Sequence, residues 1–334
     1  MKIFITGVAG FLGSHLADLM IANGHTVAGN DNMIGGYADN VPQGVEFHQV
    51  DCCDLENLTK AMEDSDIVYH TAATAYEGLS VFSPVLVTKN IFEASVTTIT
   101  AAIRNKVKRF VYCSSMARYG HHDKMPYKED FECRPQDPYG IAKKAGEDVL
   151  KNLCETHNME YVIAVPHNIV GPRQKYDDPF RNVMSIMLNR MLQGKQPIIY
   201  GDGEQKRCFS YIDDCLYCLN ALAFQDNVIG EVVNIGPDEE SCTINDLAEM
   251  CANETGLNLD TLYHRDRPQE VKIAVCSSDK ARELLGYKTS TNVRQSVQKT
   301  AEYIRSRGTK KFQYHLPLEI INDITPETWK NKLI

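Results

Sequence analysis

Residues 1–13 read MKIFITGVAGFLG, and this stretch decides the fold. Lys2–Thr6 is a short, mostly apolar run that favours a β-strand, and Gly7, Gly10 and Gly13 follow it at regular spacing. The next residues repeat leucine and methionine at helical spacing and stop at a glycine. The sequence therefore predicts a strand, a tight glycine-rich turn and a helix.

A glycine-rich turn between a strand and a helix suits a phosphate group. Glycine adopts backbone angles closed to other residues, lets a phosphate approach the backbone and allows a helix to pack closely on a strand. The helix N-terminus adds free N–H groups and the positive end of the helix dipole. We therefore expect a dinucleotide here, although a simple tight turn would carry the same glycines.

The second predicted strand, residues 25–31, ends in Asp31, and the third, residues 45–50, leads into Asp51 and Cys52. A carboxylate at the end of the second strand can accept hydrogen bonds from both ribose hydroxyls of an adenosine, and it repels a 2′-phosphate. This favours NAD over NADP. Asp51 is placed to accept a hydrogen bond from the adenine amino group, with the Cys52 backbone beside it.

Strands and helices alternate regularly through the first half of the chain. Further strands are predicted at residues 66–70, 108–114 and 161–165, and long helices at residues 84–105 and 138–157. The alternation predicts an α/β fold with a doubly wound, Rossmann-type parallel sheet. Ligands bind such sheets at the carboxyl ends of the strands. These ends carry the glycine-rich turn, Asp31, the small residues Thr71–Ala73, and Ser115.

After Pro166 the chain becomes rich in turns and short elements, which predicts a smaller C-terminal α/β substrate lobe. We expect one domain over residues 1–165 and a lobe over residues 166–334, with residues 207–225 returning to the first domain. The final stretch, residues 307–334, is predicted to be an ordered arm, and its sequence indicates no role.

The composition is that of an ordinary globular protein, with 43% hydrophobic and 24% charged residues. No apolar run reaches the ~20 residues that span a bilayer, and we expect neither a secretory signal nor a membrane partner. The net charge of −9 argues against nonspecific binding of nucleic acid. The 11 scattered cysteines predict reduced thiols and a cytoplasmic location. Cys215 and Cys218 form a CxxC pair on a predicted helix, where buried cysteines are favoured over a zinc or redox site.

Tyr139 and Lys143 lie one helical turn apart, and Ser115 follows a predicted strand end. Free tyrosine has a pKa of about 10, and a neighbouring ammonium and a positive nicotinamide ring both favour the phenolate. Tyr139 is therefore predicted to be the general base, while Lys143 holds the ribose and tunes Tyr139. Ser115 would hydrogen-bond the same substrate oxygen. Loss of the hydroxyl proton drives hydride transfer from carbon to NAD.

With these motifs in place, the sequence resembles the extended short-chain dehydrogenase/reductase family. Within that family it is most similar to the NAD-dependent epimerases and dehydratases of nucleotide sugars, and closest to the UDP-sugar 4-epimerases. The resemblance covers residues 1–306. It rests on TGVAGFLG at 6–13, DN at 31–32, HTAA at 70–73, Asn90, CSSMARYG at 113–120, YGIAK at 139–143, HNIVGP at 167–172 and RCFSYIDD at 207–214.

The resemblance implies catalysis by Ser115, Tyr139 and Lys143, no metal, and a homodimer formed through the helices at 84–105 and 138–157. The candidate residues for binding NAD are Gly7, Gly10, Phe11, Leu12, Gly13, Asp31, Asn32, Asp51, Cys52, Thr71, Ala72, Ala73, Asn90, Tyr139, Lys143 and Pro166. The candidate residues for binding a nucleoside diphosphate sugar are Tyr76, Glu77, Ser115, Met116, Asn168, Arg207 and Arg267. The two arginines match the diphosphate-binding arginines of the family, since a planar guanidinium fork suits phosphate oxygens.

The chain departs from its relatives directly after Ser115. Dehydratase relatives carry acidic residues there, whereas this chain has Met116 and Ala117, which favours epimerisation. Pro166 and His167 replace the usual aromatic pair, so the nicotinamide pocket is expected to differ.

Glu77 is the third departure, because it follows Tyr76 in a predicted substrate loop, residues 74–84. A carboxyl group here could supply the acid of an unusual dehydratase, although a solvated loop carboxylate is the simpler interpretation. We predict a 4-epimerase acting on a UDP-hexose or UDP-N-acetylhexosamine through a transient 4-keto sugar. The alternatives are a 4,6- or 5,6-dehydratase and, further away, a non-catalytic NAD-binding sensor.

Overall fold

The predicted strand, turn and helix at the N-terminus form β1 (Lys2–Thr6) and α1 (Phe11–Ala22) in the computed structural model, which describes residues 1–334. β1 lies inside a sheet of seven parallel strands, in the order β11-β6-β5-β4-β1-β2-β3. The other strands of this sheet are β2 (Thr26–Asn30), β3 (Val45–His48), β4 (Ile67–His70), β5 (Arg109–Cys113), β6 (Glu160–Pro166) and β11 (Val232–Ile235). The predicted α/β fold class is confirmed.

The order of the strands reverses beside β1, because β1 pairs with β2 on one side and with β4 on the other. Ile3, for example, is paired with Val27 of β2 and with Ile67 of β4. Ligands of open α/β sheets bind at such a switch point, outside the carboxyl ends of the strands.

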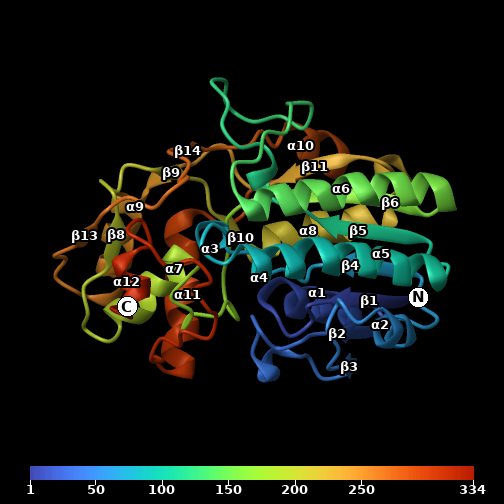
Figure 1. Ribbon diagram of the computed structural model, residues 1–334, viewed down its shortest axis with the longest axis horizontal. Helices are drawn as coiled ribbons and strands as arrows, with labels where there is room; N and C mark the ends of the chain where they lie inside the picture. The colour runs from blue at the N-terminus through green and yellow to red at the C-terminus, as the bar shows by residue number, and fades with distance from the viewer.

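Helices cover both faces of the sheet (Figure 1). One apolar core joins the sheet to α1, α8 (Ile212–Phe224) and α10 (Asp279–Leu285). The opposite core joins it to α2 (Leu55–Ala61), α5 (Ala94–Arg104) and α6 (Pro138–His157). α5 and α6 lie side by side along their face, where Figure 1 shows them in cyan and green.

The long helix α6 begins and ends at residues suited to those positions. The Asp137 carboxylate caps its first turn by accepting a hydrogen bond from the Gly140 N–H at 2.9 Å, and Pro138 occupies the first helical position. At the other end Asn158 adopts the left-handed conformation that stops a helix. These ends fix the part of α6 that carries Tyr139 and Lys143.

The predicted helix at residues 84–105 is interrupted in the structure. It consists of α4 (Pro84–Thr88), a π-helical turn η2 (Lys89–Glu93) and α5. π-Helical turns occur frequently at functional sites, and this one carries Asn90. The predicted loop before the helix also contains a short helix, α3 (Glu77–Ser80), so the expectation of an irregular loop was wrong there.

The smaller lobe is built on α7 (Val183–Met191), α9 (Ile244–Thr255) and α11 (Val293–Arg307), which share one apolar core. Its short strands are β8 (Ile198–Tyr200), β9 (Lys206–Arg207), β12 (Cys242–Thr243), β13 (Leu262–His264) and β14 (Ile273–Ala274). β7 (Ile169–Val170) pairs with β10 (Ser210–Tyr211). The remaining short helices are η1 (Ala38–Asn40), η3 (Met116–Arg118), η4 (Asp226–Val228) and α12 (Glu327–Lys330).

The chain crosses between the lobe and the large sheet more than once. Arg207 belongs to β9 of the smaller lobe, whereas α8 and β11 belong to the large sheet and its cover. We therefore propose that the segment returning to the first domain begins near residue 210 and continues through β11.

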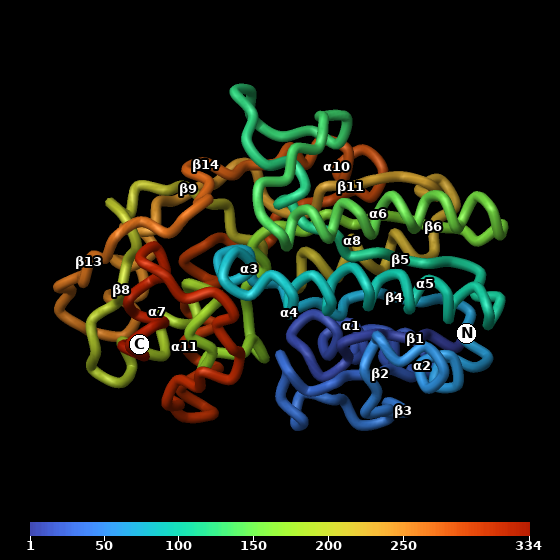
Figure 2. The backbone as a smooth tube through the Cα atoms, in the orientation of Figure 1, coloured from blue at the N-terminus to red at the C-terminus, as the bar shows by residue number.

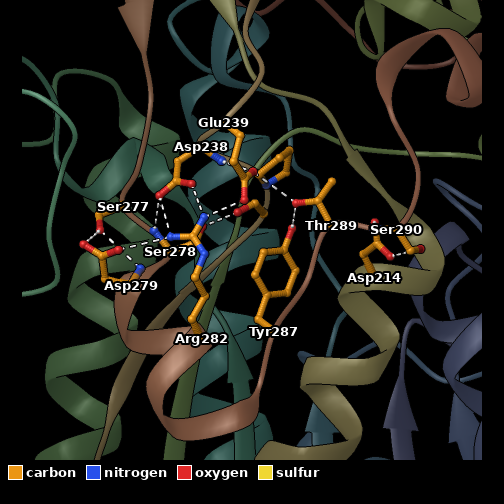
Figure 3. Close-up of polar contacts among 12 residues, drawn as sticks. Asp214, Asp238, Glu239, Ser277, Ser278, Asp279, Arg282, Tyr287, Thr289 and Ser290 are labelled. Carbon is orange, nitrogen blue, oxygen red and sulfur yellow. Dashed lines mark hydrogen bonds and ion pairs between the residues drawn. The ribbon is translucent and has the colours of Figure 1, made fainter.

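A polar network around Arg282 fastens α10 to the loop that follows β11 (Figure 3). Its guanidinium donates hydrogen bonds to Asp238 and, at 3.1 Å and 2.6 Å, to Asp279 and Glu239. Burial alone would raise the pKa of Asp238, but the bonds from Arg282 and the Ser278 N–H hold it below its usual value. The network fixes the point where the chain leaves the large sheet for β12.

All 11 cysteines are free, and Cys215 and Cys218 are buried on α8. None of the helices is both long and apolar enough to cross a lipid bilayer.

Candidate active site

A cavity of about 480 Å³ extends from the carboxyl ends of the sheet strands to the smaller lobe. Every candidate residue for catalysis, for binding NAD and for binding the nucleotide sugar lines this one cavity. Spacing and motifs from distant parts of the sequence thus converge on a single site.

The glycine-rich turn at the cavity edge has no room for side chains. Gly7 has a φ of +71°, and a Cβ on it would lie 2.8 Å from the Cα of Ala72. A Cβ on Gly13 would lie 2.2 Å from the carbonyl oxygen of Gly7. Gly36, which the sequence analysis did not single out, is equally close to the turn, since its Cβ would lie 2.2 Å from the Ala9 carbonyl oxygen. The turn therefore offers bare backbone to a ligand.

Two carboxylates follow the turn at the ends of neighbouring strands. Asp31 accepts hydrogen bonds from the N–H groups of Ala9 at 3.1 Å and Met33 at 2.7 Å, and burial raises its pKa. Burial also acts to raise the pKa of Asp51, but hydrogen bonds from Asn32 and the Cys53 N–H, both 2.8 Å, hold it below its usual value. Both side chains are held in place with oxygen lone pairs left for hydroxyl and amino donors.

Asn90 supplies a second indication of a ligand. Its Nδ2 is buried and has no hydrogen-bond partner in the protein, although the residue lines the cavity. Buried amide groups are normally paired, so this donor is available to a bound molecule. With the bare glycine backbone and the placed Asp31, it fits a dinucleotide with free ribose hydroxyls.

The strand end at residues 70–73 is tied to β1 by side-chain hydrogen bonds. Thr6 Oγ1 contacts His70 Nδ1 at 2.9 Å and accepts from the Ala72 N–H at 3.1 Å, while Thr71 Oγ1 donates to the Thr6 carbonyl at 2.6 Å. Burial lowers the pKa of His70 to about 3, so its ring is neutral. His70 thus fixes the strand end from behind as a neutral, fully buried ring, while Thr71, Ala72 and Ala73 line the cavity.

Ser115, Tyr139 and Lys143 lie together where β5 ends and α6 begins. The Ser115 side chain lies close enough to the Tyr139 hydroxyl to act on its pKa, and Lys143 Nζ donates to the Cys113 carbonyl at 2.7 Å. Burial raises the pKa of Tyr139, and Ser115 opposes this rise. Burial lowers the pKa of Lys143 to about 8. Displaced pKa values of two groups in one cavity are typical of functional sites. The rise at Tyr139 is opposite to the phenolate that the sequence predicted, because burial disfavours the charged form.

A buried ion pair behind these residues was missed from the sequence. Arg118 Nη2 lies 2.9 Å from Glu147 Oε2, and both side chains are almost fully buried. Ser114 Oγ donates to the other carboxylate oxygen of Glu147. Tyr139, Lys143 and Glu147 follow one another at four-residue spacing on α6, and this signal could have drawn attention to Glu147. Glu147 therefore holds Ser114 and Arg118, which lie on either side of Ser115 along the chain.

The smaller lobe brings two arginines to the far side of the cavity. Arg267 contacts Glu270 at 3.0 Å through Nη2, and Arg207 lies 3.6 Å from the same carboxylate. Burial acts to raise the pKa of Glu270, but Arg267 holds it below its usual value. Arg181, which the sequence analysis did not single out, lines the cavity without an ion-pair partner. The lobe therefore presents cationic charge beyond what its carboxylate neutralises, as binding of a diphosphate requires.

Glu77 lies between the arginines and the catalytic residues. Its side chain is exposed to the cavity, and the pKa responds to charges on Asp137, Arg207 and Arg267. Enclosure by the cavity walls, and then the like charge of Asp137, raise the pKa of Glu77 to about 7. Met116 also lines the cavity, with its sulfur 4.0 Å from Asn168 Nδ2.

Comparison with known proteins agrees with this geometry. Residues 3–236 match the NAD dependent epimerase/dehydratase family. A putative UDP-glucose 4-epimerase from Methanocaldococcus jannaschii is 31% identical over 310 residues, covering 92% of this chain and 99% of that protein.

Two solved structures share the architecture. The UDP-glucose 4-epimerase of Thermotoga maritima with UDP-glucose has a TM-score of 0.87 and 30% identity, over 92% of this chain and 99% of that one. The UDP-glucuronic acid 4-epimerase of Bacillus cereus, with UDP-glucuronic acid and NAD, has a TM-score of 0.84 and 30% identity, over 92% of this chain and 100% of that one. Since the match in sequence and fold runs through both parts of the chain that form the cavity, the protein belongs to the NAD dependent epimerase/dehydratase family.

Proposed function

We propose that the protein is an NAD-dependent nucleotide-sugar 4-epimerase acting on a UDP-hexose or UDP-N-acetylhexosamine. The observation that carries the proposal is the convergence of Ser115, Tyr139 and Lys143 with Arg207 and Arg267 on one cavity. The first three residues can remove a proton from a sugar hydroxyl, and the two arginines can hold the diphosphate that bears the sugar.

Tyr139 takes the proton of the sugar 4-hydroxyl as that carbon is oxidised, and Ser115 hydrogen-bonds the same oxygen. Lys143, in its ammonium form, stabilises the phenolate of Tyr139. NAD, when bound, accepts the hydride from C4 and later returns it. The 4-keto sugar rotates between these two steps and presents its other face to the returning hydride. Tyr139 then returns the proton to the C4 oxygen of the product.

The position after Ser115 separates this reaction from loss of water or carbon dioxide. η3 carries Met116 and Ala117 there, and neither side chain can donate or accept a proton. Glu77 is the observation that favours a second candidate, a 4,6- or 5,6-dehydratase, because a carboxyl with a pKa of about 7 can deliver a proton near neutral pH.

Proton NMR of the purified protein with NAD and either UDP-glucose or UDP-N-acetylglucosamine tests the proposal. A new anomeric signal at unchanged mass, lost in Tyr139→Phe and kept in the remote Tyr217→Phe, supports epimerisation. A product lighter by one water supports the dehydratase. Bound NAD with no turnover across the sugar panel, or turnover that survives Tyr139→Phe, contradicts the proposal.

We further propose a homodimer formed through the helices at 84–105 and 138–157. Val85 and Ile141 on these helices are exposed apolar side chains, 72% and 53% accessible, which a partner surface would cover. Analytical ultracentrifugation of the wild type and of Ile141→Asp tests the dimer.

We also propose a cytoplasmic location, because free cysteines favour a reducing compartment.

A further inference from the structure

The chain continues beyond α11 as an ordered C-terminal arm, residues 309–334, which includes α12. Figure 2 traces the arm in red from the end of α11 back along the smaller lobe. The compared proteins are matched over 99–100% of their lengths but over only 92% of this chain. The unmatched share of this chain is about the size of the arm. We therefore infer the role of the arm from its contacts in this structure.

The arm is fastened to the turn that joins α3 to α4. Ser83 Oγ donates to the Pro317 carbonyl at 2.6 Å, and the Glu319 N–H donates to the Phe82 carbonyl at 2.9 Å. The Glu319 carboxylate accepts from the N–H groups of Val85 and Leu86, both at 2.9 Å. α4 has no capping side chain in its own sequence, so the arm supplies its N-terminal cap.

Trp329 on α12 touches three separate walls of the cavity. Its ring centroid lies 5.4 Å from that of Phe180 and 6.4 Å from that of Tyr200. A Cβ placed on Gly78 would lie 3.4 Å from the indole. Gly78, Phe180 and Tyr200 all line the cavity, while the indole itself is only 2% exposed.

These walls carry candidate substrate residues. Gly78 directly follows Glu77 on α3, and the Tyr200 ring lies under the Arg267 guanidinium at 4.8 Å. Tyr200 also hydrogen-bonds Thr328, the neighbour of Trp329 on α12. A shift of α12 therefore reaches both Glu77 and Arg267 through one intervening contact.

A second chain of contacts leads from the arm to Tyr76. The Tyr76 hydroxyl donates to the buried Asp178 carboxylate at 2.5 Å, and His315 Nε2 lies 3.9 Å from the same carboxylate. Phe180, two residues further on, donates its N–H to Asp178 at 2.8 Å. The hydrogen bonds, ion pairs and ring contacts of the arm include none of the candidate NAD-binding residues.

We propose that the C-terminal arm supports the sugar side of the cavity, with Trp329 as the positioning residue that holds Glu77 and Arg267 toward the nucleotide sugar. The inference rests on the proposed function, since it assigns those walls to the sugar. The proposal predicts different effects on the two ligands of the cavity. Loosening the arm weakens binding of the nucleotide sugar and leaves binding of NAD unchanged. The proposal also makes the arm a determinant of which sugar is accepted, because the walls it supports set the width of that end of the cavity.

Trp329→Ala and Trp329→Phe test the role of the indole. Its Nε1 has no hydrogen-bond partner, so phenylalanine keeps most of the packing and loses no bond. We expect Trp329→Ala to raise the KM for the nucleotide sugar about tenfold and to reduce the preference between UDP-glucose and UDP-N-acetylglucosamine. Trp329→Phe should stay within about threefold of the wild type, and the NAD affinity should not change in either variant.

Two further variants separate positioning from general loss of stability. Leu222→Ala removes a buried side chain of α8 away from the cavity and should lower the melting temperature with KM unchanged. Glu319→Ala removes the exposed cap of α4 and should raise KM about threefold in a protein that folds normally. The inference is overturned if Trp329→Ala leaves KM unchanged, or if it weakens NAD binding as much as it raises KM.

Calorimetric binding of UDP-glucose keeps this test distinct from that of the proposed function. If the wild type binds the nucleotide sugar without epimerising it, the proposed function fails, and weaker binding by Trp329→Ala still supports the role of the arm. If binding is equal in the two proteins, the arm proposal fails alone. A wild type that binds no UDP-sugar overturns both.

Discussion

Removing the charge of Glu147 should destabilise the protein, because the buried Arg118 would lose its counter-ion. In Glu147→Gln the amide oxygen can still accept from Ser114, but the Arg118 guanidinium stays buried with no counter-ion, since only 4% of that side chain is exposed. Removing one partner of a buried ion pair costs about 3–5 kcal/mol. At about 2.1 cal/mol/K of unfolding entropy per residue, a chain of 334 residues should melt about 4–7 °C lower.

The pH dependence of the melting temperature distinguishes loss of Arg118 from loss of Glu147. Arg118→Met leaves a buried carboxylate that can be neutralised by a proton, so its loss of stability should be smaller at pH 5 than at pH 8. The loss in Glu147→Gln should not change with pH, because arginine stays charged. The double variant should be more stable than either single variant, since neither charge remains.

Differential scanning calorimetry of the wild type and the three variants at both pH values provides the measurement. Glu147 holds Ser114 and Arg118 on either side of Ser115, so kcat in Glu147→Gln should fall about 10–100-fold as the Ser115 hydroxyl shifts, with NAD affinity retained. Additive losses in the double variant, or a fall of less than 1 °C in Glu147→Gln, would refute the assigned role.

Three further outcomes follow from the cavity. Gly13→Ala should abolish NAD binding measured by calorimetry, because its Cβ would lie 2.2 Å from the Gly7 carbonyl oxygen, whereas Gly35→Ala meets nothing within 4 Å and should bind normally. Asn90→Ala should weaken NAD about tenfold without lowering the melting temperature, because its Nδ2 has no partner in the protein. For Glu77, enclosure raises the folded pKa to about 7, above its unfolded value, so its stabilising contribution is lost as the pH rises. Glu77→Gln should therefore gain melting temperature over the wild type between pH 5 and pH 8, modestly, because cavity solvent screens the charge.

Local patterns predicted the elements that line the side of the cavity proposed for NAD. The glycine-rich turn, Asp31 at the end of β2 and the spacing of Tyr139 and Lys143 depend on periodicity within one or two elements, which a sequence displays directly. The strand ends then meet at one edge because parallel strands must bring them there.

Contacts between distant elements could not be predicted in the same way. Arg118 and Glu147 lie 29 positions apart on η3 and α6, and nothing in either segment indicates its partner. The π-helical turn at Lys89–Glu93 requires a backbone bonding pattern that side-chain periodicity does not show. The arm was predicted to be ordered, but its proposed role depends on the contacts of Trp329 with Gly78, Phe180 and Tyr200, which come from distant parts of the chain.

The two diphosphates that this cavity is proposed to hold are bound by different means, and the difference bears on Glu77. The glycine-rich turn offers backbone N–H groups and a helix dipole, whereas the smaller lobe offers Arg207 and Arg267. These two cations are also the charges that now lower the pKa of Glu77, opposing Asp137 and Glu270. A bound diphosphate neutralises the arginines, so the remaining like charges and the diphosphate itself favour the protonated carboxyl. In the proposed complex we therefore expect Glu77 to be a neutral hydrogen-bond donor to the sugar at physiological pH. A neutral carboxyl group could orient the sugar for epimerisation, and the same group could deliver a proton in a dehydration. The mass of the product therefore decides between the two reactions that this cavity permits.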